Sequence, residues 1–237
     1  MSLRVAFDLD GTIADMESAL IRVAEQLFGP NVALRPAGSE HLDAPASVDD
    51  VADNPAKVES RPEKKQVLGG GQLRQVWERV AATENFWGTL EEIEPGSVAR
   101  IAALRDEHRL EVIFLTQRPD TQGDITQLQT QRWLRAHGFE LPSVFVLRGS
   151  RGLAAAALQI DVVVDDRPEN CLEVATESRA RPLLLWRDPV ELLPPGAKKL
   201  GIEPVPSIAE AVRLIQAMVP GAPKPSLFSR LRSVIGI

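Results

Sequence analysis

The sequence predicts an α/β protein: a Rossmann-like parallel sheet covered by helices on both faces, with a small helical cap inserted after the first strand. Two observations lead to this fold. Short apolar runs alternate with segments whose apolar residues recur at helical spacing. The apolar runs carry few polar positions, which is typical of parallel strands buried between two helix layers. With 237 residues, 44% of them hydrophobic, the chain is long enough for one core and a smaller subdomain.

The first strand lies within residues 3–8, and the cap is predicted to follow it over residues 14–93. Helical spacing begins at Asp15, which is placed to cap a helix that ends before Gly29. Residues 35–70 are rich in proline and charged residues without periodicity, so we expect a flexible insertion there. The glycines at 69–71 are expected to act as a hinge before a second helix that starts at residue 72.

The main body is predicted to comprise residues 1–13 and 94–205. Its remaining strands are expected at 110–115, 144–147, 160–164 and 182–186, and its helices at 97–108, 120–137, 152–158 and 168–178. A C-terminal helical tail is expected over 206–237, with a helix at 207–218. The basic, amphipathic stretch 226–237 is expected to dock on its own domain, with contact to a partner or a membrane surface as the alternative.

Bulk composition narrows the function classes. A net charge of -6 argues against general nucleic-acid binding, but a small phosphorylated substrate responds to the local field of its pocket. Cys171 is the one cysteine, so an intrachain disulfide is excluded and a zinc cluster is disfavoured. Without a signal sequence or a transmembrane run, we expect a cytoplasmic protein. The sequence does not indicate an oligomeric state.

Polar residues stand where three of the predicted strands end. Asp8 and Asp10 follow the first strand, Thr116 follows the second, and Asp165 and Asp166 end a later one. In open parallel sheets, ligands bind beyond the carboxyl ends of the strands. Each residue alone is as well explained as a helix or turn cap, but their coincidence at strand ends indicates one site. Carboxylates this close repel one another unless a cation or a proton lies between them.

These residues resemble the four ordered motifs of the haloacid dehalogenase-like superfamily of aspartate-nucleophile phosphatases. The motifs correspond here to residues 8–12, to residues 113–116, to Arg151 and to residues 163–166. Within the superfamily, the chain is most similar to the 5'(3')-deoxyribonucleotidase branch. The resemblance covers nearly all of residues 1–186 and fails over the insertion and the tail.

The resemblance implies a nucleophile, Asp8, that forms an aspartyl-phosphate, and a general acid and base, Asp10. It also implies Mg²⁺ bound by Asp8, Asp10 and Asp166, with Asp10 contributing its backbone carbonyl. Asp165 is expected to support this set of ligands.

Phosphate binding is expected from Thr116, Arg151, Gly11 and Thr12. Gly11 lets the backbone turn sharply where a side chain would obstruct a ligand. Lysine is usual where Arg151 stands, and Arg148 is the competing candidate for this role.

Two further features concern the substrate. Phe86 and Trp87 are candidates for an aromatic platform against a nucleobase, with packing in the cap's own core as the equal alternative. Arg118 is a candidate substrate ligand, but a solvated loop arginine is the simpler interpretation.

We therefore expect an Mg²⁺-dependent phosphomonoesterase that acts on a small phosphorylated metabolite, with a (deoxy)nucleotide as one candidate. Dehalogenation is disfavoured, because Asp10 supplies a proton that halide loss does not need. The alternative is a catalytically weak phosphate-binding or scaffold protein of the same fold that uses its linker and tail to bind partners.

Overall fold

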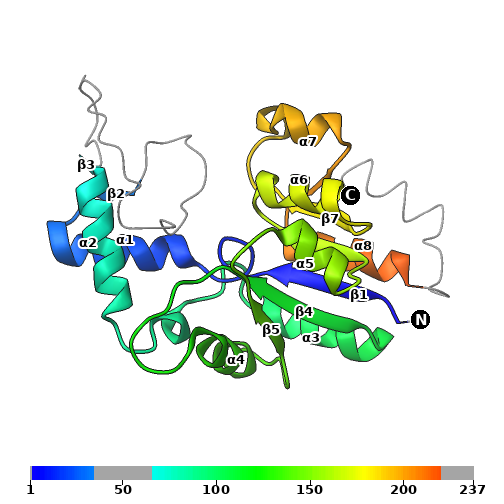
Figure 1. Cartoon of the computed structure of the whole chain (residues 1–237), viewed down its shortest axis with the longest axis horizontal. Coiled ribbons are helices and arrows are strands. Elements are labelled where there is room, and N and C mark those ends of the chain that lie inside the picture. Colours follow the sequence, from blue (N-terminus) through cyan, green and yellow to red (C-terminus); the bar gives the residue numbers. More distant parts are fainter. Residues whose placement is uncertain (1, 35–65, 220–237) are drawn as a thin grey trace.

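The computed structural model describes residues 2–34 and 66–219 (Figure 1). Its centre is a six-stranded sheet in which every neighbouring pair is parallel, in the order β5-β4-β1-β6-β7-β8. The strands are β1 (Arg4–Asp8), β4 (Glu111–Thr116), β5 (Ser143–Val146), β6 (Val162–Asp165), β7 (Arg181–Leu185) and β8 (Glu203–Val205). The predicted α/β fold with a parallel sheet is confirmed.

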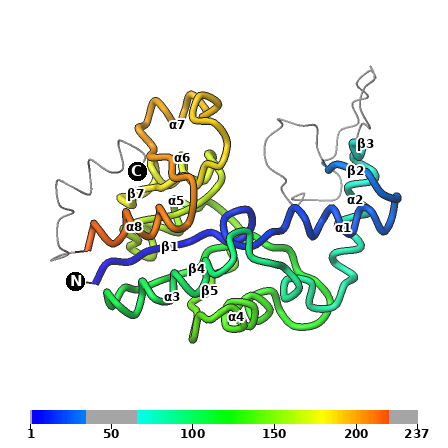
Figure 2. Tube along the Cα trace, turned by 180° about the vertical axis from the view of Figure 1, so that it is seen from behind, coloured from blue at the N-terminus to red at the C-terminus, as the bar shows by residue number. Residues whose placement is uncertain are grey.

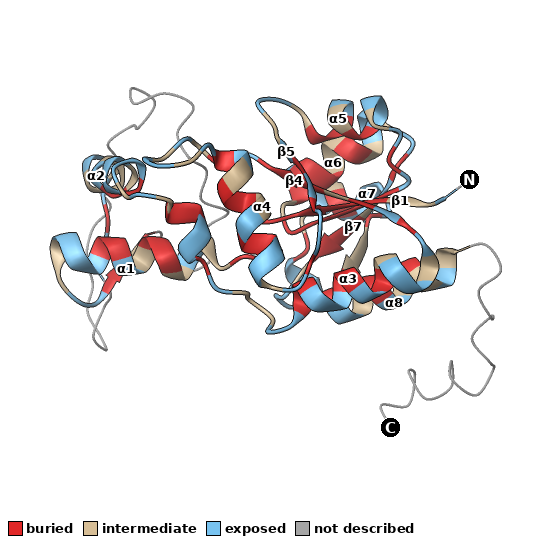
Figure 3. Ribbon diagram, turned by 90° about the horizontal axis from the view of Figure 1, so that it is seen from below, coloured by how far each residue is buried: buried red, intermediate tan, exposed pale blue. Residues whose placement is uncertain are grey.

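Helices cover both faces of the sheet (Figure 3). The first face carries α3 (Ser97–His108), α4 (Thr126–Ala136) and α8 (Ile208–Met218). The second carries α5 (Arg151–Ala157) and α6 (Pro168–Glu177), with η2 (Val190–Leu192) and α7 (Pro195–Lys199) beyond β7. Strand side chains alternate between the faces, so Val5 and Phe7 pack on the first and Ala6 on the second.

A smaller group of elements leaves the sheet after β1 and returns before α3. It contains α1 (Met16–Phe28), β2 (Val32–Ala33), β3 (Gln66–Val67), α2 (Gly70–Ala81) and η1 (Phe86–Thr89). Figures 1 and 2 show α1 and α2 side by side, away from the sheet. Asp15 caps α1 as predicted, accepting a 3.0 Å hydrogen bond from the amide of Ser18. Gly29, with a φ of 90°, ends the helix.

The structure differs from the sequence-based expectation in several places. The glycines expected to form a hinge instead start α2, with Gly69 as its N-cap. Residues 66–67, expected within the flexible insertion, pair with β2. The helix expected from residue 120 starts at Thr126, because Gly123 adopts a φ of 95° and the Asn85 side chain binds the amide of Asp124 at 2.9 Å. Residues 35–65 of the insertion and residues 220–237 lie outside the described residues.

Two elements near the C-terminus complete the core. The short strand β8 was not predicted, and it extends the sheet beside β7. Helix α8 packs beside α3 and contributes Ile208, Ala211 and Ile215 to the same core, so the first part of the expected tail belongs to the helix layer. No helix in the two described stretches is long and apolar enough to cross a membrane.

Candidate active site

The candidate site lies where three adjacent strands end. The chain leaves β1 towards β4 on one side and reaches β6 on the other, and such a change of direction in strand order is where α/β sheets bind ligands. Asp8 is the last residue of β1 and is in register with Leu115, one residue before Thr116. Asp165 ends β6. The sheet therefore brings together side chains more than 100 positions apart in the sequence.

Three buried carboxylates form the centre of the site. Each of Asp8, Asp165 and Asp166 offers an oxygen atom within 4.8 Å of the oxygens of the other two. Burial raises the pKa of Asp8 well above its ordinary value; Arg151 opposes this effect, whereas Asp165 and Asp166 add to it. Burial, followed by the charge of Asp165, raises the pKa of Asp166 to about 7. The cluster therefore favours binding of a cation or a proton.

Gly11 and Thr12 hold Asp166 in place. The Thr12 hydroxyl donates to Oδ1 of Asp166 at 2.8 Å and accepts from its amide at 3.1 Å. A Cβ added to Gly11 would lie 2.3 Å from Oδ2 of Asp166, and the φ of 85° at Gly11 also disfavours a side chain. The amide of Gly11 donates to Ala14. The Gly11 amide and the Thr12 hydroxyl are thus engaged within the loop and with Asp166, and the predicted phosphate-binding role of these two residues stays a prediction.

Arg151, in the first turn of α5, provides the positive charge of the cluster. Its Nη2 forms an ion pair with Oδ1 of Asp8, and its Nε lies 3.1 Å from Oδ2 of Asp165. Its Nη1 is buried and has no hydrogen-bond partner among the described residues. A buried donor without a partner is costly, so this atom is suited to an anionic ligand. The competing candidate, Arg148, is exposed.

Asp165 is occupied by supporting contacts. The Asn170 amide group donates to both of its oxygens at 3.0 Å, and the amide of Arg167 donates to Oδ1 at 2.9 Å. This arrangement agrees with a supporting role for Asp165. Asn170 was not identified from the sequence, although its position one turn into the helix after the acidic pair was a usable signal.

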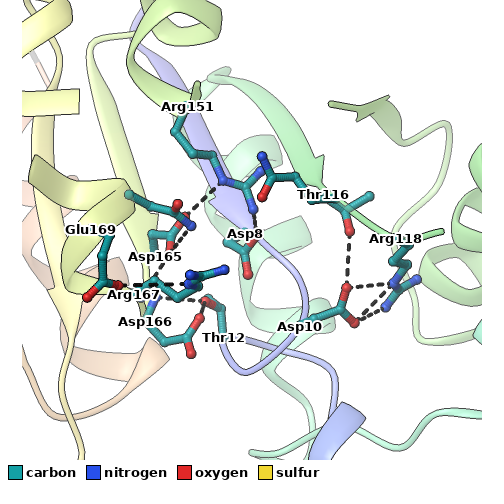
Figure 4. A network of polar contacts seen from close by, with 12 residues as sticks. Asp8, Asp10, Thr12, Thr116, Arg118, Arg151, Asp165, Asp166, Arg167 and Glu169 are labelled. Carbon is teal, nitrogen blue, oxygen red and sulfur yellow. Dashed lines mark hydrogen bonds and ion pairs between the residues drawn. The ribbon is translucent and has the colours of Figure 1, made fainter. Parts of the chain in front are cut away.

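Asp10 faces away from the carboxylate cluster (Figure 4). Its carboxylate accepts hydrogen bonds from Nε and Nη2 of Arg118, at 2.8–3.0 Å, and one of 3.1 Å from the Thr116 hydroxyl. The carboxylate of Asp10 is thus outside the group of possible metal-binding oxygens, which leaves its backbone carbonyl for the predicted metal role. Thr116, predicted to bind phosphate, contacts Asp10 here.

The surroundings of Arg118 correct one expectation and distinguish between the two alternatives for Phe86 and Trp87. Arg118 is buried, so the interpretation as a solvated loop arginine is wrong. Its guanidinium carbon lies 4.9 Å from the centre of the Trp87 ring. Trp87 has no exposed surface, and Phe86 is 4% exposed and packs edge-on against it. The structure therefore favours packing over a nucleobase platform for Phe86 and Trp87. The partners of Trp87 belong to the main body and not to the cap: its backbone amide donates to the Gln129 side chain, and its indole nitrogen donates to the Pro119 carbonyl.

A pocket opens above Asp8, Asp10 and Arg151, and the cap contributes to its wall. Met16 of α1 and Trp77 of α2 line it together with residues that follow β4 and β6, among them Gln117 and Arg167. Trp77 is half-buried. Its helical spacing indicated packing in the cap, and only the tertiary structure places it on the pocket.

The residues present fit a hard divalent cation. Carboxylate oxygens are the ligands that Mg²⁺ prefers, and Asp8 and Asp166 supply them from two different strand ends. Within the described part of the chain, Oδ2 of Asp8 accepts no hydrogen bond from a side chain or backbone group. The tight approach of Asp166 to Gly11 would hold one carboxylate in a fixed position.

No family model matches the sequence, and no curated protein matches it. Solved structures do match. A HAD family hydrolase from Deinococcus radiodurans R1, with bound phosphate and sodium, is 18% identical with a TM-score of 0.52, and the match covers 94% of this chain and 98% of that one. A dehalogenase with an intermediate complex is 13% identical with a TM-score of 0.51, over 90% of this chain and 97% of that one.

At this level of identity the likeness concerns the fold. Neither structure is described as a nucleotidase. With the strand order described above, the chain has the α/β fold of the haloacid dehalogenase-like hydrolases.

Proposed function

We propose that this protein is an Mg²⁺-dependent phosphomonoester hydrolase that works through an aspartyl-phosphate on Asp8. The observation that carries the proposal is the buried cluster of Asp8, Asp165 and Asp166 beside Nη1 of Arg151, which has no hydrogen-bond partner in the described part of the chain. Such a cluster carries negative charge in excess of the single guanidinium paired with it, which a divalent cation would offset. The free arginine donor beside it is suited to a phosphoryl oxygen.

In the first step, an oxygen of Asp8 forms a bond to phosphorus while the bond from phosphorus to the leaving oxygen breaks. Asp10, protonated, gives its proton to that leaving oxygen, so that an alcohol departs. Arg151 holds Asp8 by the ion pair to Oδ1 and offers Nη1 to the transferred group.

In the second step, Asp10 as carboxylate takes a proton from water, and the water oxygen attacks phosphorus. The bond between phosphorus and Asp8 breaks, which restores the Asp8 carboxylate and releases inorganic phosphate. Mg²⁺, held by Asp8, Asp166 and the Asp10 carbonyl, would neutralise charge on the phosphoryl oxygens when bound. The burial of Asp165 and its contacts with Asn170 keep the carboxylate cluster in place.

The substrate is proposed to be a small phosphorylated metabolite. Nucleoside monophosphates remain among the candidates, supported by the half-buried Trp77 on the pocket wall rather than by the buried Phe86 and Trp87. A panel of phosphorylated metabolites, including nucleotides and sugar phosphates, should be compared for kcat/KM on the wild type and on Trp77→Leu. A selective loss on nucleotides in the variant would support a stacking role, and an equal loss on every substrate would contradict it.

Hydrolysis of p-nitrophenyl phosphate tests the reaction itself. We expect Mg²⁺-dependent turnover that EDTA abolishes, and a loss of about 10³-fold or more in Asp8→Asn. The exposed Asp188 gives a matched control, Asp188→Asn, which should retain activity. Turnover that persists in Asp8→Asn refutes the nucleophile, and the absence of turnover on every phosphate tested, with phosphate binding retained, would favour the scaffold alternative.

A further inference from the structure

Several hydrogen bonds fix the Asp10 carboxylate and the Arg118 guanidinium relative to each other. Nε of Arg118 lies 3.0 Å from Oδ1 and 2.8 Å from Oδ2 of Asp10, and Nη2 lies 2.8 Å from Oδ1. The Thr116 hydroxyl adds the contact to Oδ2 at 3.1 Å. A carboxylate has about four acceptor positions. The single Nε hydrogen is shared between both oxygens, so these contacts use most of the positions and define one orientation of the group.

Arg118 is itself fixed from behind. Its Nη1 donates to the hydroxyl of Thr130 at 3.0 Å, and that hydroxyl donates to the carbonyl of Thr126 within α4 at 2.8 Å. The face of Trp87 lies against the guanidinium at 4.9 Å, within the range of a cation–π contact. The guanidinium is planar and is fixed both by the hydrogen bond to Thr130 of α4 and by the ring of Trp87, so it can hold the Asp10 carboxylate in one orientation. A lysine ammonium is a single point charge and would not define that orientation.

Arg118 and Asp10 differ in how far their side chains are exposed. The side chain of Arg118 has no exposed surface, whereas 13% of the Asp10 side chain is exposed. All three guanidinium nitrogens of Arg118 already donate to Asp10 or Thr130. Every guanidinium nitrogen of Arg118 is thus bound to a protein group and its side chain has no exposed surface, so Arg118 is poorly placed to bind a substrate although it is among the residues that line the pocket.

We propose that Arg118 is a positioning residue that orients Asp10 for proton transfer. This inference rests on the proposed phosphatase reaction and differs from the expectation that Arg118 binds substrate. When a phosphoryl group enters, its oxygens attract the Thr116 hydroxyl, which frees one position on Oδ2 while Arg118 continues to hold Oδ1. The proton then passes from Oδ2 of Asp10 to the oxygen of the breaking P–O bond, which leaves as an alcohol.

The test compares two leaving groups in kcat/KM, which covers the steps up to formation of the aspartyl-phosphate. Ethyl phosphate needs a proton on its leaving oxygen, whereas p-nitrophenyl phosphate leaves readily as an anion. General acid catalysis contributes about 10²–10⁴-fold. For Arg118→Met we expect a loss of about 10- to 100-fold on ethyl phosphate and of less than about threefold on p-nitrophenyl phosphate, with Arg118→Lys between Arg118→Met and the wild type.

A double-mutant cycle provides the decisive readout. If Arg118 acts only through Asp10, then Arg118→Met in an Asp10→Asn background should cause no further loss on ethyl phosphate. An equal loss in both backgrounds, an equal loss on both substrates, or a gain on ethyl phosphate would each overturn the proposal.

Two further variants distinguish a loss of the Arg118 contacts from a general loss of folding. Arg132→Met removes an exposed arginine of α4 that pairs with Asp124, and it should leave both substrates unaffected. Thr130→Val removes the support behind Arg118 with little change in volume, and it should show the same leaving-group preference at about three- to tenfold. If Arg118→Met does not fold, the cycle is run with Thr130→Val. A wild type inactive on both phosphates refutes the phosphatase reaction, whereas an active wild type with an additive cycle refutes only the role of Arg118.

Discussion

Replacing Asp166 by asparagine should stabilise the metal-free protein while it disables the metal site. Asp166 is buried beside Asp165 and has its pKa raised from 3.8 to about 7. One pKa unit corresponds to about 1.4 kcal/mol. The ionised carboxylate therefore costs the folded state about 4 kcal/mol above pH 7. Asparagine cannot ionise, and its amide oxygen can still accept the hydrogen bond from Thr12.

The sign of the effect follows from proton binding. The folded protein binds a proton at Asp166 more tightly than the unfolded chain does, so this group lowers the free energy of unfolding as the pH rises from about 4 to about 7. For Asp166→Asn we expect a gain of about 2–4 kcal/mol over the wild type at pH 8, and less than about half of that at pH 5. Saturating Mg²⁺ should reverse the order at pH 8, because the ion stabilises only the protein that binds it.

Urea denaturation in EDTA, at pH 5 and pH 8, measures this difference. The exposed Asp188 supplies the control, since Asp188→Asn should change the free energy of unfolding by less than about 0.5 kcal/mol at both pH values. If Asp166→Asn is no more stable than the wild type at pH 8, the reasoning is refuted, because ionisation of Asp166 would then not lower the free energy of unfolding.

Three further changes test other parts of the site. Arg151→Met should lower the free energy of unfolding in EDTA by about 3–5 kcal/mol, measured with urea, because it leaves buried carboxylates without their partner. Gly11→Ala should raise the Mg²⁺ concentration for half-maximal activity about tenfold or more, since its Cβ would lie 2.3 Å from an oxygen of Asp166. Asn170→Ala should weaken Mg²⁺ binding, measured by calorimetry, about 10- to 100-fold, because Asp165 loses two contacts.

Each of the three changes has an outcome that would contradict it, and Gly11→Ala also has a matched control. Gly71→Ala, in the first turn of α2 with open space around its Cα, should leave the Mg²⁺ requirement unchanged and the protein equally or more stable. An unchanged Mg²⁺ requirement in Gly11→Ala would mean that the loop yields without moving Asp166. Tight Mg²⁺ binding by Asn170→Ala would mean that Asp165 is held without it, and an unaltered stability of Arg151→Met would show that solvent reaches the cluster.

Much of the fold could be predicted because its signals are local. The apolar runs that became β1, β4 and β6 identified buried parallel strands, and the acids at their ends marked the edge where a site forms. Strand β8 was not predicted, because its three residues, which include Pro204, are too few to show a hydrophobic period. The start of α4 was misplaced because a contact from Asn85, about forty positions away, stabilises a loop where the local pattern indicates a helix.

The amino-acid sequence by itself determined the α/β class, the order along the chain of five of the six strands of the sheet, and which acids end them, since hydrophobic periodicity acts over a few residues. Only the tertiary structure decided which charges pair. Asp8 pairs with Arg151 and not with Arg148, and Asp10 pairs with Arg118. The physical reason is that a side chain's ion pair depends on which strand ends meet. Asp10 and Arg118 are 108 positions apart in sequence, and the parallel pairing of β1 with β4 brings them together.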